Sequence, residues 1–316
     1  MENKCLYCYE PLNEESYFHK KCSQEFFGMP TPPEIPYSYD QMAELAKNIV
    51  ERSIAVPGVQ AKLSMSLIKE TQETSNGRLT VVGALGGNYI FKPPSDKFPE
   101  MPQNEHVTMR IAEAFNLHVV PSSLIRLASG ELSYITKRMD RDENGEKIHM
   151  LDMFQITEAF DKYKSSMEKV GKALHSYSEN TMLDKIFYFE LSLFCFLTGN
   201  NDMHLKNFSM IKSTSGWILA PAYDLLNVAL VLPEDSEELA LTLEGKRKKL
   251  TIDLFVKFAK GLELTDKQIE SVLKRMIKNK QKAIDWIDKS FLSDNSKIGY
   301  KQILESRYFH LKLTDF

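Results

Sequence analysis

Residues 199–209 read Gly-Asn-Asn-Asp-Met-His-Leu-Lys-Asn-Phe-Ser, a polar stretch that follows directly on the most apolar part of the chain. That part, residues 181–197, is apolar almost all round, which predicts a helix in the centre of a helical lobe. Because a packed helix holds the loop after it, we expect the polar side chains to be presented rigidly over a cleft. Asp202 and Asn207, five residues apart in this loop, are therefore the first candidates for a functional site.

A further carboxylate, Asp224, comes after a predicted short hairpin made of residues 208–211 and 217–219. Carboxylate and amide oxygens suit a hard cation, and Mg²⁺ prefers them together with phosphate. Three such side chains on neighbouring loops therefore indicate a magnesium site that serves a phosphate-bearing substrate.

Two charged residues lie upstream, in a part of the chain with strand character. Lys92 ends the apolar strand of residues 89–91, and Glu105 opens the helix that follows. A strand lysine held by a helix glutamate orients the nucleotide phosphates in kinases. The order of lysine, glutamate, aspartate, asparagine and later aspartate matches the logic of a protein kinase, although the H-R-D, D-F-G and G-x-G-x-x-G signatures are missing.

The hydrophobic pattern changes from strand-like to helical along the chain. An amphipathic helix is predicted over residues 40–52, and strands follow it, interrupted by one helix near residues 103–115. We expect these strands to form an antiparallel meander, with a helix-rich part after the polar loop at residues 140–145. The predicted strands are residues 63–67, 79–82, 88–92, 119–127 and 132–136, and the later helices are residues 181–197, 264–291 and 296–311.

The composition is that of an ordinary soluble globular protein. The 316 residues suit one large or two medium domains, and 40 Lys+Arg against 43 Asp+Glu give a formal charge of −3. With 43% hydrophobic and 26% charged residues, collagen-like, wholly disordered and strongly nucleic-acid-coating classes are excluded. No segment reaches the roughly 20 apolar residues that a bilayer requires, and the N-terminus lacks the apolar core of a signal peptide. We expect a cytoplasmic protein without membrane contact.

Three of the four cysteines lie in the first 22 residues. Cys5, Cys8, His19 and Cys22 have the spacing C-x2-C-x10-H-x2-C, which is typical of a structural zinc site. The alternative is a hairpin with unligated thiols in a reducing compartment, and spacing alone does not decide between the two. Four prolines in residues 28–36 then predict an extended linker between this head and the body.

Six segments together resemble the HipA family of serine/threonine kinases, the toxins of bacterial type II toxin–antitoxin modules. They occur in the family's order, and the resemblance extends to about residue 311. The segments are Ser53–Leu63, Phe91–Pro93, Asn104–Glu105, Lys137–Arg141, Asn201–Ser209 and Tyr223–Asp224.

The resemblance implies an α+β, two-lobed, protein-kinase-like fold with a sheet-rich N-terminal lobe and an all-helical C-terminal lobe. Together with the patterns above, it divides the chain into a Cys/His head at residues 1–28, a Pro-rich linker at 29–39, an N-terminal lobe at 40–150 and a C-terminal lobe at 151–316. Full-length relatives carry an additional N-terminal subdomain before this region. The chain resembles a short form in which that subdomain is a separate polypeptide.

The resemblance also implies roles for individual residues. Asp202 is expected to be the catalytic base, Asn207 and Asp224 to hold Mg²⁺, and Lys92 to contact the phosphates of ATP with Glu105 as its ion-pair partner. The remaining nucleotide-binding residues fall in a phosphate-covering loop, in the connection between the lobes and in the polar loop, where His204 is chiefly a structural residue. They are Gly58, Val59, Gln60, Lys62, Leu151, Met153, Phe154, His204 and Lys206, and Ser53 matches the serine that these kinases autophosphorylate.

By resemblance, the chain is an ATP- and Mg²⁺-dependent toxin kinase of protein Ser/Thr, with a target in translation such as an aminoacyl-tRNA synthetase. A HipB-like helix-turn-helix antitoxin would bind it and place the pair on operator DNA. Two alternatives remain open. One is a kinase of a small molecule, and the other is a non-catalytic module that binds antitoxin and operator with nucleotide as a structural ligand.

Overall fold

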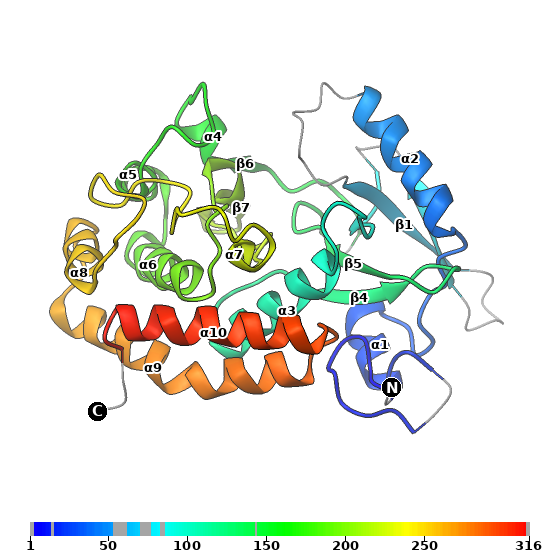
Figure 1. The fold of residues 1–316 in the computed structure, drawn as a ribbon. Helices are drawn as coiled ribbons and strands as arrows, with labels where there is room; N and C mark the ends of the chain where they lie inside the picture. The colour runs from blue at the N-terminus through cyan, green and yellow to red at the C-terminus, as the bar shows by residue number, and fades with distance from the viewer. Residues whose placement is uncertain are drawn as a thin grey trace. The chain divides into compact units, whose positions relative to one another are not determined.

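The computed structural model describes residues 3–13, 16–52, 62–69, 77–82, 86–142 and 144–313 (Figure 1). The chain forms two compact units, each of which collects segments from different parts of the sequence. The first contains residues 1–106, 120–146 and 289–291, and the second contains residues 107–119, 147–288 and 292–316.

The first unit is built on a five-stranded antiparallel sheet. Its strands have the order β2-β1-β3-β5-β4, so β1 lies between β2 and β3. The strands are β1 (Leu63–Lys69), β2 (Gly77–Val82), β3 (Tyr89–Lys92), β4 (Ser122–Arg126) and β5 (Leu132–Lys137).

The predicted meander is therefore wrong in its pairing, because β3 joins β1 and not its sequence neighbour β2. Leu63 lies opposite Phe91 and Met65 lies opposite Tyr89 across this pair. All four side chains are buried. Because β2 pairs with the other side of β1, both edges of β1 are hydrogen-bonded to a neighbouring strand. The half-buried end of β2 suits the edge of a sheet, where one side of the strand remains in contact with water.

Three helices complete the first unit or begin in it. The helix predicted at residues 40–52 is confirmed, and the one predicted at 103–115 begins two residues earlier. The helices are α1 (Lys20–Phe27), α2 (Tyr39–Arg52) and α3 (Met101–Ala114). The first of them ends at Gly28 with φ 73°, a left-handed conformation that glycine adopts at low cost.

The second unit is mainly helical, but it contains a small antiparallel sheet of order β6-β7-β8. Its strands are β6 (Met150–Asp152), β7 (Ser209–Ser213) and β8 (Gly216–Leu219), and the last two form the hairpin predicted from the sequence. The expected all-helical C-terminal lobe is therefore wrong in this detail, because β7 and β8 form a hairpin that pairs with β6. The helices are α4 (Met153–Ile156), α5 (Met167–Tyr177), α6 (Thr181–Leu197), α7 (Val228–Val231), α8 (Ile252–Gly261), α9 (Asp266–Lys289) and α10 (Asp294–His310), with a 3-10 turn η1 (Leu205–Asn207).

The apolar helix α6 is buried as predicted, because every residue from Leu191 to Leu197 is covered. Its C-terminal end leads into the loop at residues 199–209. Among the described residues, the helices are too short or too polar to cross a membrane.

Candidate active site

Lys92 and Glu105 form a buried ion pair in the first unit. Lys92 is the last residue of β3, and its Nζ lies 2.5 Å from Oε1 of Glu105 in the first turns of α3. The side chains are 4% and 2% exposed, so both charges are withdrawn from water. The lysine Nζ also lies 5.3 Å from the centroid of the Tyr134 ring, which adds a cation–π contact. The structure thus brings together two residues that are 13 positions apart in sequence.

The polar loop of the second unit is held by hydrogen bonds to the backbone of Asp202. The Asp202 carbonyl accepts from the His204 backbone N–H at 2.8 Å and from Nδ2 of Asn207 at 3.0 Å. The Asn207 side chain is buried, and its Oδ1 accepts no hydrogen bond from the described residues. The amide group therefore fixes the loop with its nitrogen and keeps its oxygen available as a ligand.

The Asp202 carboxylate has one hydrogen-bond donor that sequence reasoning missed. Tyr163 Oη donates to Asp202 Oδ1 at 2.8 Å. Burial, and then the charge of Asp202, raise the pKa of Tyr163 well above its usual value, so the hydroxyl keeps its proton. Tyr163 lies outside every quoted motif, in a loop 39 residues upstream, and no pattern in the sequence points to it.

His204 lies against the same tyrosine. The two rings meet edge to face, with centroids 5.0 Å apart and an interplanar angle of 79°. Burial lowers the pKa of His204, which the nearby charge of Asp202 opposes only in part. The neutral imidazole is therefore favoured at neutral pH, which agrees with a structural histidine of the loop.

Asp224 is positioned by the β7–β8 hairpin. Met210 pairs with Leu219, and the Ala220 backbone N–H donates to the Ser209 carbonyl at 2.9 Å. The hydroxyl of Tyr223 then donates to the carbonyl of Lys206 at 2.8 Å, which ties the segment before Asp224 to the polar loop.

The backbone of Asp224 is in the left-handed region, with φ 60°. This conformation is uncommon for residues other than glycine, asparagine and aspartate, and outliers of this kind gather at functional sites.

The nucleotide-binding residues expected in the connection between the lobes lie in β6 and at the start of α4. Leu151 pairs with Met210 on β7 and is 40% exposed, whereas Met153 is fully buried in the core. Lys206 Nζ lies 4.8 Å from the centroid of the half-buried Phe154 ring, so these two predicted residues meet. Leu151 also lines an apolar cavity of about 220 Å³, together with Ile156, Tyr177, Met210 and Trp217.

Gly58, Val59 and Gln60 of the predicted phosphate-covering segment lie outside the described residues, and so does Ser53, the predicted autophosphorylation site. Lys62, the last residue of that set, is exposed and directly precedes β1.

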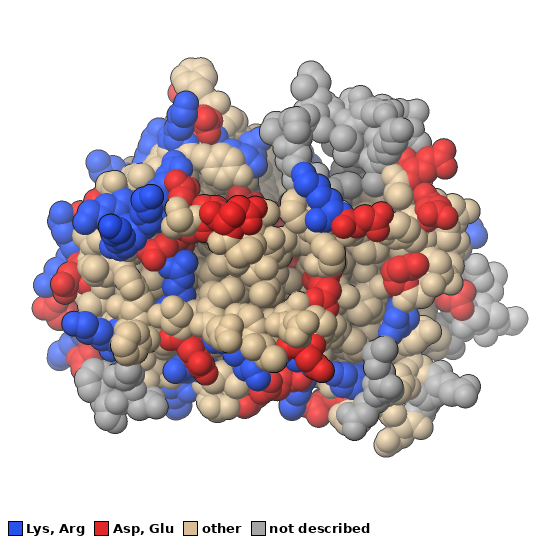
Figure 2. All heavy atoms as spheres, viewed as in Figure 1, with Lys and Arg blue, Asp and Glu red and all other residues tan. Residues whose placement is uncertain are grey.

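A basic surface lies on the second unit, over α5 and α8 (Figure 2). The loop at residues 244–249 is tied to both helices, because the Glu244 backbone N–H donates to Glu168 and the Glu244 carboxylate pairs with Lys257 at 2.6 Å. Arg247 of this loop donates to the carbonyl of Tyr163. The basic loop and the tyrosine that contacts Asp202 are therefore directly connected.

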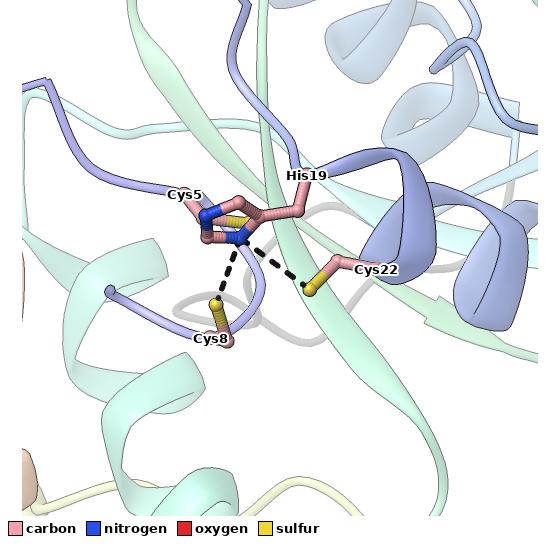
Figure 3. Close-up of side chains that lie close together, drawn as sticks. All are labelled: Cys5, Cys8, His19 and Cys22. Carbon is pink, nitrogen blue, oxygen red and sulfur yellow. Dashed lines mark hydrogen bonds between the residues drawn. The ribbon is translucent and has the colours of Figure 1, made fainter. Parts of the chain in front are cut away.

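The four Cys/His residues of the head converge on one point, in the first unit (Figure 3). The ligand atoms of Cys5, Cys8, His19 and Cys22 all lie within 4.8 Å of one another. His19 Nδ1 lies 3.3 Å from Cys8 Sγ and 3.8 Å from Cys22 Sγ. The hydrogen bond with Cys8 lowers the pKa of the Cys5 thiol to about 4, while burial raises that of Cys22 to about 11. This cluster could hold a metal ion.

Comparison with known proteins gives a family and a fold. A family model described as "HipA-like C-terminal domain" matches residues 54–284. A "Putative kinase" of Haemophilus influenzae is 27% identical over 290 residues, which cover 82% of each protein. "Putative kinase Y4dM" of Sinorhizobium fredii is 30% identical over 253 residues, which cover 74% of this chain and 59% of that protein.

Two solved structures share the fold. One is HipA in a Shewanella oneidensis toxin–antitoxin complex of HipA, HipB and operator DNA, with a TM-score of 0.68 at 22% identity over 88% of this chain and 71% of that chain. The other is the Helicobacter pylori proinflammatory kinase CtkA, with a TM-score of 0.52 at 15% identity over 74% of this chain and 90% of that chain. The predicted α+β, kinase-like fold is confirmed.

Proposed function

The chain belongs to the HipA-like C-terminal domain family, and on this premise we propose that it transfers the γ-phosphate of ATP to a serine or threonine of a protein. The observation that carries the proposal is the buried ion pair between Lys92 and Glu105. Withdrawing two charges from water costs several kcal/mol per ion, and apolar residues of similar size would avoid that cost. The cost of burying this ion pair is explained if Glu105 holds the Lys92 ammonium group where it can contact the phosphates of a nucleotide.

Asp202 is proposed to accept the proton of the substrate hydroxyl. Tyr163 occupies one oxygen of its carboxylate, and Oδ2 accepts no hydrogen bond from the described residues. The tyrosine would orient the carboxylate, and the second oxygen would face the attacking hydroxyl. Such alignment is what phosphoryl transfer requires of a protein, because the reaction depends on positioning and charge neutralisation.

Asn207 and Asp224 are proposed to hold Mg²⁺. The buried amide oxygen of Asn207 together with a carboxylate is a donor set that fits this hard cation. When bound, the ion would neutralise the charge on the transferred phosphate. The chain's own contribution is the Tyr223 hydroxyl, which fixes the carbonyl of Lys206 and with it the spacing of the two segments.

The rest of the nucleotide site is proposed from the sequence together with local contacts. Phe154 and Lys206 would contact the nucleotide, since their side chains already meet each other. Met153 would support them from the core, and Leu151 would present its exposed side chain. Gly58, Val59, Gln60 and Lys62 would cover the phosphates, and Ser53 would be the autophosphorylation site.

The proposed partners rest on what one structural relative assembles with. HipA of Shewanella oneidensis was solved with HipB and operator DNA, so we propose a HipB-like antitoxin that carries any DNA contact. A translation protein such as an aminoacyl-tRNA synthetase is the proposed target, and a separate N-subdomain-like protein is a further proposed partner. Because ATP is the phosphate donor, the proposed location is the cytoplasm. A Zn²⁺ ion is proposed for the Cys/His cluster, away from phosphoryl transfer.

The test is an assay with γ-labelled ATP and Mg²⁺, with and without a bacterial lysate, on wild type, Asp202→Asn and the control Asp285→Asn. Asp285 is an exposed carboxylate on α9 that contacts Gln281 within its own helix. We expect labelled protein with wild type and the control only, and phosphoserine or phosphothreonine after hydrolysis. Label that enters only small molecules would indicate a metabolite kinase instead. Nucleotide binding without any transfer would contradict catalysis and favour a binding module.

A further inference from the structure

The head and the Lys92–Glu105 pair are joined by buried contacts within the first unit. We propose that Zn²⁺ bound by Cys5, Cys8, His19 and Cys22 fixes Tyr9 against His106 and thereby holds helix α3, with Glu105, in position for Lys92. The zinc site stands on geometry alone. Only the consequence for ATP rests on the proposed function.

The separations of the donor atoms are close to those of a zinc site. Zn–S bonds of about 2.3 Å and Zn–N bonds of about 2.0–2.1 Å in a tetrahedron put ligand atoms about 3.5–3.8 Å apart. The contacts from His19 Nδ1 to Cys8 and Cys22 are 3.3 and 3.8 Å. Because all four ligand atoms lie within 4.8 Å of one another, closing on an ion requires side-chain movements of about 1 Å or less.

The imidazole of His19 is oriented as a zinc ligand. Its Nε2 lies 3.0 Å from the carbonyl oxygen of Pro11, and since a carbonyl only accepts, Nε2 carries the proton. In the neutral imidazole, Nδ1 is then the nitrogen with the free lone pair, and it is the atom that faces the sulfurs (Figure 3). Histidine ligands in zinc sites commonly use their second nitrogen to bond a carbonyl in this way.

The turn that carries Cys5 and Cys8 also sets the backbone of Tyr9. The Tyr9 N–H donates to the Cys5 carbonyl at 3.0 Å, and the Cys5 N–H donates to the Glu10 carbonyl at 2.9 Å. Tyr9 has φ 65°, a conformation that bulky residues disfavour. An ion that clamps Cys5 and Cys8 would hold this turn, and the direction of the Tyr9 side chain would follow from it.

The Tyr9 side chain reaches helix α3 directly. Its hydroxyl lies 2.7 Å from Nδ1 of His106, and the two buried rings meet edge to face with centroids 5.2 Å apart. His106 follows Glu105 in the chain, and its ring lies 6.5 Å from that of Tyr134, over which Lys92 Nζ is placed. Displacement of Tyr9 would therefore reach both members of the ion pair.

The head also contacts the short segment 289–291 that belongs to the same unit. Lys4 Nζ donates to the carbonyl of Lys289 at 2.8 Å, and Glu10 forms an ion pair with Lys289 at 2.7 Å. The Tyr9 ring meets Phe291 edge to face at 5.2 Å. These contacts keep the tyrosine enclosed, so substitution of its hydroxyl alone should leave the ring in place.

The first experiment measures metal in the full-length protein. Wild type purified without added metal should contain one zinc per chain, and cobalt-substituted protein should show thiolate-to-metal charge-transfer absorption. Cys8→Ser should lose both signals, whereas Cys195→Ala should keep them, because Cys195 is buried in α6 and outside the cluster. Folded wild type that binds neither zinc nor cobalt would overturn the proposal, and so would a Cys8→Ser variant with full zinc content.

The second experiment separates positioning from folding, with Tyr9→Phe and Tyr7→Phe as a matched pair. Tyr7 Oη donates to Glu25 Oε1 inside the head. Tyr7→Phe therefore removes one tyrosine hydroxyl, as Tyr9→Phe does, but it leaves the contact between Tyr9 and His106 intact. Tyr9→Phe should keep its zinc, speed amide hydrogen exchange in α3 and weaken binding of a Mg²⁺–ATP analogue roughly three- to tenfold, the effect of one lost hydrogen bond. Tyr7→Phe should leave exchange in α3 and nucleotide affinity unchanged.

Exchange in α3 that is equal in wild type, Tyr9→Phe and chelator-treated protein would overturn the positioning role. Exchange and zinc content are read without catalysis, so they decide the inference even if wild type transfers no phosphate. Absence of nucleotide binding in zinc-loaded wild type would instead contradict the proposed kinase function.

Discussion

Tyr163 Oη donates a 2.8 Å hydrogen bond to Oδ1 of Asp202 and joins two loops that are 39 residues apart. The same tyrosine packs edge to face on His204, and its carbonyl accepts from Arg247 of the basic loop. The side chain proposed as the base is therefore oriented from outside its own motif. This arrangement makes Tyr163 a positioning residue.

Tyr163→Phe should lower kcat about tenfold and leave KM for ATP nearly unchanged. A hydrogen bond to a charged group contributes about 1.5–3 kcal/mol. Only part of this energy should appear as a higher activation free energy, because the carboxylate would be less well aligned in the transition state. The measurement is steady-state kinetics with labelled ATP. Tyr17→Phe is the control, because Tyr17 is half exposed and packs on Arg126 in the other unit. An unchanged kcat for Tyr163→Phe would contradict the orienting role.

Lys92→Met should abolish nucleotide-dependent activity and lower stability by about 3–5 kcal/mol, because it leaves the Glu105 carboxylate buried without its ammonium partner. The double variant Lys92→Met/Glu105→Gln removes the buried carboxylate charge as well. It should recover much of the stability in denaturant titrations and none of the activity.

The single and double variants separate the effect of the buried carboxylate on the free energy of unfolding from the role of Lys92 in activity. If the single variant were as stable as wild type, the ion pair would not be buried as the structure has it. Activity in the double variant would contradict a role for Lys92 with ATP.

Much of the first unit could be predicted because its signals are local. Strand and helix patterns placed Lys92 at a strand end and Glu105 in the next helix, and the order of residues found in kinases predicted that the two would pair, as they do in the structure. The order of the strands could not be predicted in this way. Alternation sets which face of β1 is buried, whereas the choice of β3 as its partner depends on side chains from the whole sheet.

The same limit applies to the polar loop. Asp202 and Asn207 share a motif, and the 3.0 Å hydrogen bond between them is a local contact. The contact with Tyr163 depends on how the loop after α4 folds back, and no short-range pattern encodes it. In the head, by contrast, the ligand spacing favoured a cluster of four side chains without deciding it, and the structure brings the four together.

The stability of the fold should fall in acid partly because of His204. Burial lowers its pKa in the folded protein from the ordinary value of 6.5, so the unfolded chain binds the proton first as the pH drops. This contribution to the free energy of unfolding is fully present when the pH is above the pKa of His204 in the unfolded chain. Below that pH it is lost, at up to about 1.4 kcal/mol for each pH unit, until the pH reaches the pKa in the folded protein.

Denaturant titrations between pH 7.5 and 5.5 test this for wild type, His204→Gln and His149→Gln. The slope of unfolding free energy against pH should be smaller for His204→Gln than for wild type, while the exposed His149 should make little difference. Equal slopes for all three proteins would contradict a buried, neutral His204.

Asp224 offers a way to separate backbone conformation from metal binding. Its φ of 60° is tolerated by asparagine and preferred by glycine, whereas other side chains lose about 1–2 kcal/mol there. Asp224→Asn should therefore melt close to wild type, and Asp224→Ala should melt lower.

Both variants remove a charged ligand, so both should need at least about tenfold more Mg²⁺ for half-maximal activity, on the order of one lost charge-assisted contact. The measurement is a Mg²⁺ titration of the labelled-ATP assay beside a thermal melt. A wild-type Mg²⁺ requirement in Asp224→Asn would exclude this carboxylate as a ligand, whereas equal melting of the two variants would show that the left-handed backbone costs the fold little.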